Sequence, residues 1–467
     1  MRQFPLEELE TSPGSVVQWR PRIRPDAVSG RSGERASFNQ AKHYSSIRGS
    51  RLAGDPLASW LAVTFEVEGE PDLAALEAAV LLLVRRHEVL RCEFERLAGD
   101  LSCAVHGADD IELSRVERGF FASSTELLGF LGDEFRRGID TLAWPLCMAG
   151  AVVRPGAPAT VYLAFDHIVS DGMSMLYVID EVQRAYRAYS RGEEPDLAEA
   201  GGYVDFARDQ RDRYLEIGAD DHRLAHWRRF AENNGGVFPR FSPDLGVEPG
   251  RTYPVLSEAG QLLDAEETAA FEAACRAEGG RLFMGLLATV GTTLREEGGR
   301  EVYRGLMPVS ERDRTGRQSA IGWFVNTLPI EFPVSAGLDF GGLVRGVRDA
   351  FEEMMRHAEV PFVRVWELLA PEHFDRHSWP YPVNFFSYID TRKFPGAESH
   401  PGWKPALHVW ASRSNGANSW FVRDAAGLHF NSLYASTPRA RAVMAGIHET
   451  LRRTLREMAA AGLVSAR

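Results

Sequence analysis

The sequence has few cysteines and no long hydrophobic run. Its 467 residues include four widely spaced cysteines, and none of them form a metal-type pair: Cys92, Cys103, Cys147 and Cys275. This usage is typical of a reduced, cytosolic protein without a disulfide framework. No stretch approaches the roughly 18 apolar residues of a membrane helix, and the acidic N-terminus lacks the apolar core of a secretory signal. We therefore expect a cytoplasmic protein with no membrane partner.

The chain also has fewer basic than acidic residues. Lys and Arg number 53 against 65 Asp and Glu, which gives a formal net charge of -12. Because binding to a phosphate backbone needs a basic surface, nucleic acid is excluded as the main partner. No glycine pair is followed by the Lys-Ser/Thr of a phosphate loop, so we expect no nucleotide site. The length allows two or three domains, and 44% hydrophobic residues indicate an ordinary globular protein.

The most informative stretch is Ala159-Thr-Val-Tyr-Leu-Ala-Phe-Asp-His-Ile-Val-Ser-Asp-Gly-Met173. Its first half alternates with a period of two, which predicts a strand that ends at Asp166 and His167. A polar break follows, and apolar residues then recur at helical spacing to about Tyr189. Catalytic residues are often mounted at strand ends of α/β sheets. From position alone, a structural histidine bonded to a backbone carbonyl is the commoner interpretation of His167.

Helix-like and strand-like patterns alternate along the rest of the chain, which predicts an α/β or α+β class. Residues 1–35 are rich in Pro, Gly and Ser, and we expect them to be irregular. A boundary between two halves is expected within residues 190–250. Residues 37–43 are expected to open a short helix, and Asp264-Ala-Glu-Glu267 has the form of a capping box. The other expected helices cover residues 72–87, 124–137, 203–230, 264–279, 281–295, 342–358 and a C-terminal segment from 436. The expected strands cover 60–67, 146–153, 160–167, 302–309, 325–332, 383–389, 407–411, 419–422 and 428–433.

Six segments then fall in one order along the chain. They are Arg86-His-Glu-Val-Leu-Arg-Cys-Glu-Phe94, Asp166-His-Ile-Val-Ser-Asp-Gly172, Tyr203-Val-Asp-Phe-Ala207, Ile321-Gly-Trp-Phe-Val-Asn-Thr-Leu-Pro329, His357-Ala-Glu-Val-Pro-Phe362 and the segment around Pro382-Val-Asn-Phe385. In this order they closely resemble the condensation domains of nonribosomal peptide synthetases, within the superfamily of chloramphenicol acetyltransferase-like acyltransferases. The resemblance covers roughly residues 36–460. The segments from Arg86, Asp166 and Ile321 are specific in combination, and each alone is weak.

The resemblance implies an α/β fold of two chloramphenicol acetyltransferase-like lobes in a V, with a tunnel between them for a phosphopantetheine arm. We place the N-terminal lobe at residues 1–195 and the C-terminal lobe, with the floor-loop and tunnel-facing segments, at 196–467. Because no adenylation, carrier or thioesterase segment is left over, we expect a free-standing enzyme.

The family motif is His-His-x-x-x-Asp-Gly, and its second histidine corresponds to His167. The departure is Asp166, which stands where the family has its first histidine, a residue mostly viewed as structural. A carboxylate beside the imidazole would alter the local field and the pKa of His167.

Forming an amide or ester from a thioester requires a nucleophile and proton handling. The Gly-x-Ser-x-Gly pattern of a serine nucleophile is absent, so direct attack by the acceptor is the simplest route. His167 would act as the general base or position the acceptor, and once protonated it could help to hold the oxyanion.

Two further motif residues have structural interpretations. Asp171 precedes the predicted helix and suits an N-cap or a salt bridge; in the family the equivalent aspartate pairs with an arginine, for which Arg91 and Arg312 are the candidates. Gly172 is expected to permit a tight turn, with its amide directed into the site.

Other candidates come from the resemblance alone. Trp323 and Asn326 belong to the segment that resembles the tunnel floor, although Trp323 could serve packing and Asn326 a turn. Asn384 and Ser387 would face the tunnel and could bond the substrate.

The remaining histidines suggest no metal site. His87 is expected to be structural despite its motif. His222 and His226 are four residues apart on a predicted helix, but no third ligand is suggested, so we expect no metal.

The sequence therefore predicts a condensation enzyme of natural-product biosynthesis. It would join an aminoacyl or acyl thioester, tethered to a peptidyl or acyl carrier protein, to a small amine or alcohol acceptor. No cofactor is expected to be bound, because the phosphopantetheine belongs to the carrier. The alternatives are an acyl-CoA-dependent acyltransferase and a non-catalytic recruitment module, the latter supported only by Asp166.

Overall fold

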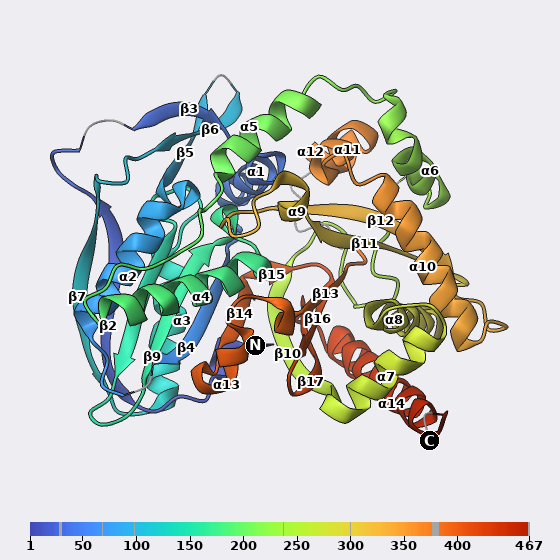
Figure 1. Ribbon diagram of the computed structural model, residues 1–467. Helices are drawn as coiled ribbons and strands as arrows, with labels where there is room; N and C mark the ends of the chain where they lie inside the picture. The colour runs from blue at the N-terminus through green and yellow to red at the C-terminus, as the bar shows by residue number, and fades with distance from the viewer. Residues whose placement is uncertain are drawn as a thin grey trace. The chain divides into compact units, whose positions relative to one another are not determined.

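The chain forms two compact units in the computed structural model, which describes residues 1–27, 30–67, 69–97, 99–236, 238–298, 300–375 and 383–465 (Figure 1). Unit 1 comprises Met1–Glu216, Ser310–Val325 and Lys393–Ala411, and unit 2 comprises Ile217–Val309, Asn326–Arg392 and Ser412–Arg467. The chain first passes to unit 2 after Glu216, within the range 190–250 expected for the boundary but displaced from the lobe division placed at 195; the two later segments of unit 1 were not expected. Helix α5 (Tyr203–Tyr214) accounts for the displacement, because its buried Phe206 packs against Phe324 within unit 1.

Unit 1 is built on a seven-stranded sheet with the order β1-β14-β4-β9-β8-β2-β7. All neighbouring strands are antiparallel except β1 and β14. The strand that leads to His167, β9, lies at the centre and is buried along its whole length. The strands of this sheet are β1 (Arg2–Gln3), β2 (Gly14–Ile23), β4 (Ser59–Val67), β7 (Ile111–Phe121), β8 (Cys147–Val153), β9 (Ala159–Asp166) and β14 (Ala406–Ala411).

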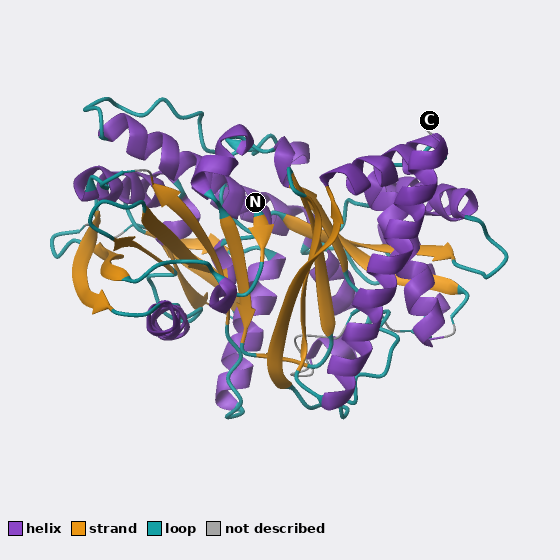
Figure 2. Cartoon of the chain, turned by 90° about the horizontal axis from the view of Figure 1, so that it is seen from below, coloured by secondary structure: helices purple, strands orange, loops and turns teal. Residues whose placement is uncertain are grey.

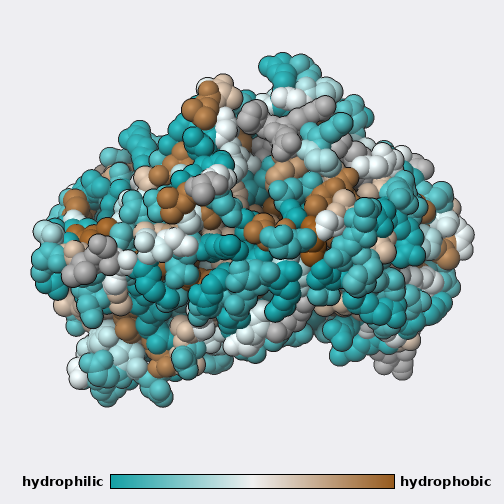
Figure 3. All heavy atoms as spheres, turned by 90° about the horizontal axis from the view of Figure 1, so that it is seen from above, coloured by the Kyte–Doolittle hydropathy of each residue, from teal (hydrophilic) through white to brown (hydrophobic). Residues whose placement is uncertain are grey.

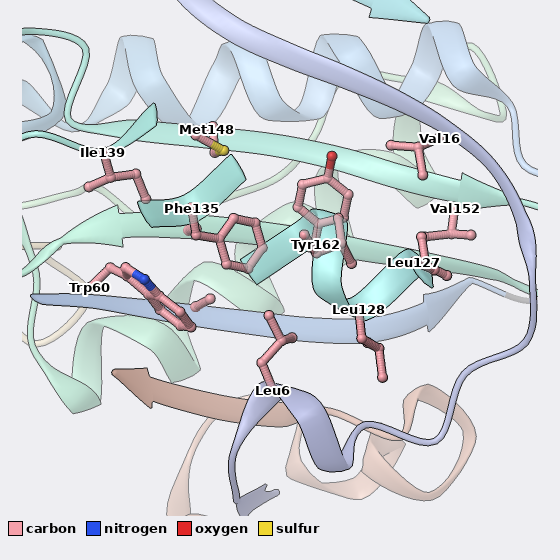
Figure 4. Packing of buried hydrophobic residues seen from close by; sticks show 13 residues of the cluster. Leu6, Val16, Trp60, Leu127, Leu128, Phe135, Ile139, Met148, Val152 and Tyr162 are labelled. Atoms are coloured by element: carbon pink, nitrogen blue, oxygen red, sulfur yellow. The ribbon is translucent and has the colours of Figure 1, made fainter. Parts of the chain in front are cut away.

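A hydrophobic core joins one face of this sheet to helix α3 (Ser124–Gly138) (Figure 4). Phe135 of α3 packs against Tyr162 of β9 and edge-on against Trp60 of β4, with ring centroids 5.6 and 5.2 Å apart. Since side chains alternate along a strand, Val161, Leu163 and Phe165 point to the opposite face. Helices lie on both sides of these strands (Figure 2). Each fully buried side chain contributes about 1.5–3 kcal/mol, so β9 is held firmly from both faces.

The prediction that residues 1–35 are irregular is wrong. Residues 14–23 form the ten-residue strand β2, which lies between β7 and β8, and residues 31–35 form β3. Val16 and Trp19 of β2 are completely buried. Neighbouring strands on both sides stabilise β2 despite Pro21 and the polar residues around it, a tertiary effect that local composition does not reveal.

The remaining elements of unit 1 surround this sheet. A second, three-stranded sheet has the order β3-β6-β5. Helices α2 and α4 pack against each other. These elements are β3 (Arg31–Arg35), β5 (Cys92–Leu97), β6 (Asp100–Val105), α1 (Phe38–Leu52), α2 (Leu73–Arg86), α4 (Gly172–Tyr189), α9 (Arg312–Thr315), α13 (His400–Trp403) and the 3-10 helices η1 (Leu6–Glu8), η2 (Glu88–Arg91) and η3 (His167–Val169).

Unit 2 has a five-stranded sheet with the order β13-β16-β17-β10-β15, and a separate pair, β11 and β12. The long helix α14 packs against α7, α8 and β10. Its strands are β10 (Tyr253–Asp264), β11 (Val302–Ser310), β12 (Val325–Pro333), β13 (Phe386–Asp390), β15 (Arg413–Ser414), β16 (Ala417–Asp424) and β17 (Gly427–Ala435), and its helices are α6 (Ala225–Asn233), α7 (Ala265–Ala277), α8 (Leu282–Gly298), α10 (Phe340–Arg356), α11 (Phe362–Leu369), α12 (Pro371–Asp375) and α14 (Pro438–Ser465).

Most expected elements of unit 2 are confirmed. Asp264 forms the predicted capping box with Glu267, and α7 starts directly after it. Two differences stand out. The single helix expected over residues 203–230 is divided into α5 and α6, and strand β10 was not expected at all.

The surface drawn in Figure 3 is mainly hydrophilic, with hydrophobic residues in small groups. The large hydrophobic residues with the most exposure are Leu52 and Phe120, at 79% and 68%. Within the described ranges, every helix is too short or too polar to cross a lipid bilayer.

Candidate active site

His167 lies at the turn that connects β9 to α4, as the sequence predicted. The Asp166 carboxylate accepts a hydrogen bond from the backbone N–H of Ile168 at 2.8 Å, which caps the 3-10 helix that starts at His167. The Ser170 hydroxyl donates to the carbonyl of Asp166 at 2.9 Å. The polar break in the sequence is therefore a hydrogen-bonded turn, and it fixes the backbone on which the imidazole is mounted.

The imidazole of His167 lies between two other rings. Its centroid is 4.0 Å from the Trp323 ring, with an interplanar angle of 31°, and 6.2 Å from the His43 ring of α1. His43 also meets Trp323 edge-on at 5.5 Å. His167 keeps part of its surface exposed, whereas its Nδ1 is buried and has no hydrogen-bond partner within the residues described.

Burial lowers the pKa of His167 below its usual value, and the neighbouring His43 lowers it further. A contact with its own backbone and the charges of Asp166 and Asp171 raise this pKa, but they do not reverse the shift. His167 is therefore neutral near pH 7, which is the protonation state of a general base.

Asp166, the departure from the family motif, is almost completely buried and belongs to a small polar network. Its carboxylate accepts a hydrogen bond from the Thr141 hydroxyl at 2.6 Å. His43 Nε2 lies 3.6 Å from the carboxylate and 3.5 Å from the same hydroxyl. Because a buried carboxylate needs polar partners, this network explains how an aspartate is accommodated where the family has a histidine.

Asp171 forms a buried ion pair with Arg312. The two terminal guanidinium nitrogens donate to the two carboxylate oxygens, both at 2.9 Å. The carboxylate also caps α4 by accepting from Ser174 N at 2.7 Å, and it accepts from Phe324 N at 2.9 Å. Of the two candidates left open by the sequence, the structure selects Arg312, because Arg91 instead donates to the carbonyl of His106.

The segment that carries Trp323 is held against the loop after β9 by these contacts and by Tyr203. The Ser174 hydroxyl bonds the carbonyl of Gly322 at 3.0 Å, and the Tyr203 hydroxyl bonds the carbonyl of Trp323 at 3.1 Å. Gly322 has φ +152°, and a Cβ there would come within 2.1 Å of the Tyr203 ring. Only glycine permits this close approach, so the position of the Trp323 ring depends on it.

The expectation that Gly172 forms a tight turn is wrong. Gly172 is the first residue of α4, and its φ is not positive. A Cβ added there would meet no atom within 4 Å. The backbone therefore does not require glycine, and its absent side chain leaves space beside the loop.

The other predicted site residues belong to unit 2, and their contacts differ. The Asn326 side chain is buried and fully engaged: it donates to the carbonyls of Ala358 and Val360 and accepts from Thr327 N and Phe362 N. These bonds favour the structural interpretation over substrate contact.

Asn384 and Ser387 lie on or next to β13. Asn384 is buried and donates to the carbonyl of Arg304 at 2.8 Å, and Ser387 is half-buried on the strand. Of the motif segment to which Asn384 belongs, Pro382 lies outside the described residues.

Sequence reasoning missed His43, Thr141, Ser174 and Tyr203 as neighbours of the site. His43 belongs to a segment that the sequence identified only as the start of a helix, and Ser37 does form the capping box of α1. No pattern distinguished His43 from other helical histidines. His87, in contrast, is structural as expected, because it is buried and paired with Glu181 at 3.1 Å.

The comparisons with known proteins agree with this arrangement. The Condensation domain family matches residues 50–408, and the chain belongs to this family. It is 29% identical over 390 residues to the acyltransferase PapA3 of Mycobacterium tuberculosis, which covers 81% of this chain and 80% of that protein. It is 31% identical over 369 residues to the 2'-acyl-2-O-sulfo-trehalose (hydroxy)phthioceranyltransferase PapA1 of Mycobacterium bovis, covering 78% of this chain and 70% of that protein.

Solved structures show the same fold. PapA2 acyl transferase superposes with a TM-score of 0.86 at 24% identity, over 98% of this chain and 100% of that chain. The first condensation domain of the calcium-dependent antibiotic synthetase superposes with a TM-score of 0.69 at 17% identity, over 92% and 97%. The fold is that of condensation domains in the chloramphenicol acetyltransferase-like superfamily, and the chain is an acyltransferase.

Proposed function

We propose that this acyltransferase moves an acyl group from a carrier-bound thioester to a hydroxyl group, with His167 as the general base. The observation that carries the proposal is the placement of His167 on a rigid turn, neutral and partly exposed, against Trp323. Because Nδ1 is buried, Nε2 is the ring nitrogen left to face an acceptor.

The reaction then needs no covalent enzyme intermediate. The acceptor oxygen attacks the thioester carbonyl carbon while Nε2 of His167 takes the hydroxyl proton. The tetrahedral intermediate collapses with cleavage of the carbon–sulfur bond, and the imidazolium returns its proton to the leaving thiolate. The products are an ester and a thiol, so atoms and charges balance.

The relatives support a hydroxyl acceptor rather than an amine. PapA1 and PapA2 are named for acylation of sulfated trehalose, a sugar whose acylation at oxygen gives an ester. The relation to a peptide synthetase, a linear gramicidin synthase of Brevibacillus parabrevis, is 33% identity over 68% of this chain and 4% of that protein. That relation supports a carrier-bound donor and keeps an amine acceptor as the alternative.

The test is product formation from a loaded carrier protein, followed by mass spectrometry with wild type and His167→Ala. A general base contributes roughly 10²–10⁴-fold, so the variant should lose activity by this factor. His87→Gln, at a motif histidine outside the site, is the control. Equal rates for wild type and His167→Ala would remove His167 from the mechanism.

Acyl-CoA is the second candidate donor, and a parallel assay separates the two. The same acyl group is supplied on CoA and on the carrier at equal concentration. A higher kcat/KM with CoA would mean that the donor is an acyl-CoA and not a carrier-bound thioester. The proposed role of His167 would be unchanged.

A further inference from the structure

Three side chains of unit 2 meet outside the site described above. Glu353 and His357 are four residues apart at the end of α10, and therefore lie on the same side of the helix. His226 approaches them from α6. Each offers one ligand atom, and these atoms all lie within 4.8 Å of one another. The sequence paired His226 with His222 and predicted no metal, because no third ligand was suggested. The side chain of His222 is 92% exposed and is not part of this cluster.

The contacts converge on one carboxylate oxygen, Oε1 of Glu353. His357 Nε2 is 3.1 Å from it, and His226 Nδ1 is 3.9 Å from it. The other oxygen, Oε2, is occupied by Arg356. Arg356 thus fixes the carboxylate and leaves Oε1 directed toward the two histidines.

Both ring nitrogens of His226 are buried and have no hydrogen-bond partner within the described residues. A neutral imidazole has one N–H donor and one acceptor nitrogen, and leaving a buried polar group unpaired costs about 1–3 kcal/mol. Such a group in a folded protein calls for an explanation, of which an ion is one.

We propose that His226, Glu353 and His357 form a binding site for a divalent transition metal ion, with zinc as the expected ion. Two imidazoles and one carboxylate are a common zinc ligand set. Ligand atoms of a tetrahedral zinc are about 3.3 Å apart, given bonds of about 2.0–2.1 Å. The separation between His357 and Glu353 already matches this value, and the separation between His226 and Glu353 needs to shorten by about 0.6 Å.

One rearrangement is required. The rings of His226 and His357 are stacked, with centroids 4.3 Å apart and an interplanar angle of 8°. A lone pair lies in the plane of its ring, so two nearly parallel rings cannot both direct one at the same ion. His357 is the ring that would turn, because its side chain is 34% exposed, whereas that of His226 is 14% exposed.

The ion would connect two helices. Three protein ligands leave a fourth position for water, as in open zinc sites. His357 directly precedes the segment Ala358–Val360, and Asn326 donates to the carbonyls of both Ala358 and Val360. Metal binding would therefore fix the end of α10 to α6 and stabilise this part of unit 2.

The experiment measures metal content and thermal stability of the full chain. The purified protein is stripped with chelator, exposed to Zn²⁺, dialysed and analysed by elemental mass spectrometry, with Tm measured with and without Zn²⁺. We expect one zinc per chain and a higher Tm. Co²⁺ in place of Zn²⁺ should give the visible absorption of a tetrahedral site.

Three variants test the assignment. His226→Ala and Glu353→Gln should each lose the bound zinc and the rise in Tm, and His222→Ala, at the exposed neighbouring histidine, should retain both. Circular dichroism shows whether each variant is folded. The proposal is overturned if folded wild type keeps no zinc after dialysis, or if His226→Ala retains as much zinc as wild type.

Discussion

The ring of Trp323 covers the ring of His167, with the centroids 4.0 Å apart. This contact helps to exclude water from the imidazole, and burial is the main reason that the pKa of His167 is lowered. The two residues are 156 positions apart in sequence, and Gly322 and Tyr203 fix the tryptophan in place.

Trp323→Ala should therefore raise the pKa of His167 toward its usual value. On acidification, His167 would then lose its neutral base form at a higher pH than in wild type. The acid limb of the plot of kcat/KM against pH would therefore move to higher pH. Trp323→Phe keeps an aromatic ring over His167 and should shift the limb less. The measurement is kcat/KM against pH for the three proteins, and an unchanged or downward shift in Trp323→Ala would contradict the burial argument.

Asp166→Asn should move the same limb in the opposite direction. The charge of Asp166 raises the pKa of His167, so removing that charge lowers this pKa further. The amide oxygen can still accept from Ile168 N, and its nitrogen can donate to the Thr141 hydroxyl, so the fold should be kept. Activity would persist to lower pH than in wild type. A limb that moves upward, in a variant with unchanged Tm, would show that Asp166 does not act on His167 through its charge.

Local pattern accounts for the parts of the site that are continuous in sequence. The end of β9 and the start of α4 follow from periodicity alone, and both were predicted to within one residue. The sequence only narrowed the partner of Asp171 to Arg91 or Arg312. Arg312 is 141 positions from Asp171, and no sequence pattern shows that the two lie close together in the fold. His43 was missed for the same reason, since its position beside the site depends on ring contacts in the folded chain and not on a spacing in the sequence.

The N-terminal strand β2 shows another limit of pattern reading. Prolines and glycines around residues 14–23 suggested irregular structure, yet six of these ten residues are buried. Neighbours on both sides supply the hydrogen bonds and packing that hold the strand. The sequence around β2 contains no signal of those neighbours, which lie about 100 residues or more further along the chain.

Removing one member of the Asp171–Arg312 pair should destabilise the protein strongly. Both side chains are nearly inaccessible, at 2% and 1% exposure, so Arg312→Ala leaves a buried carboxylate without its main partner. Breaking such a pair costs about 3–5 kcal/mol. Arg312→Lys should also fail to restore stability, because an ammonium cannot make the paired bonds to both oxygens. Urea unfolding measures the loss.

A double variant distinguishes the pair from general damage to packing. Asp171→Asn with Arg312→Gln removes both charges, and the combined loss should be smaller than the sum of the two single losses. Additive losses would mean that the two residues stabilise the protein independently.

His408 should make stability fall in mild acid. It is completely buried on β14, where Nδ1 donates to the carbonyl of Phe4 at 2.9 Å and Nε2 accepts from the Thr64 hydroxyl at 3.0 Å. Burial lowers the pKa of His408 from 6.5 to about 4. As the pH falls below 6.5, His408 therefore becomes protonated in the unfolded chain but stays neutral in the folded chain. The contribution of His408 to the free energy of unfolding is complete above pH 6.5. It is lost as the pH falls to about 4, a loss of about 3 kcal/mol.

The variant His408→Gln isolates this contribution. It should be less stable than wild type at pH 7, because the hydrogen bonds of the ring are lost or weakened. Its free energy of unfolding should nevertheless fall less steeply between pH 6.5 and pH 4, by up to about 1.4 kcal/mol per pH unit. Thr64→Val is the matched control: it removes the partner of Nε2 but keeps the titrating ring, so it should be destabilised and retain the steep slope. Equal slopes in His408→Gln and wild type would mean that His408 is not protonated on unfolding in this range, and the acid sensitivity would then have to come from other buried histidines.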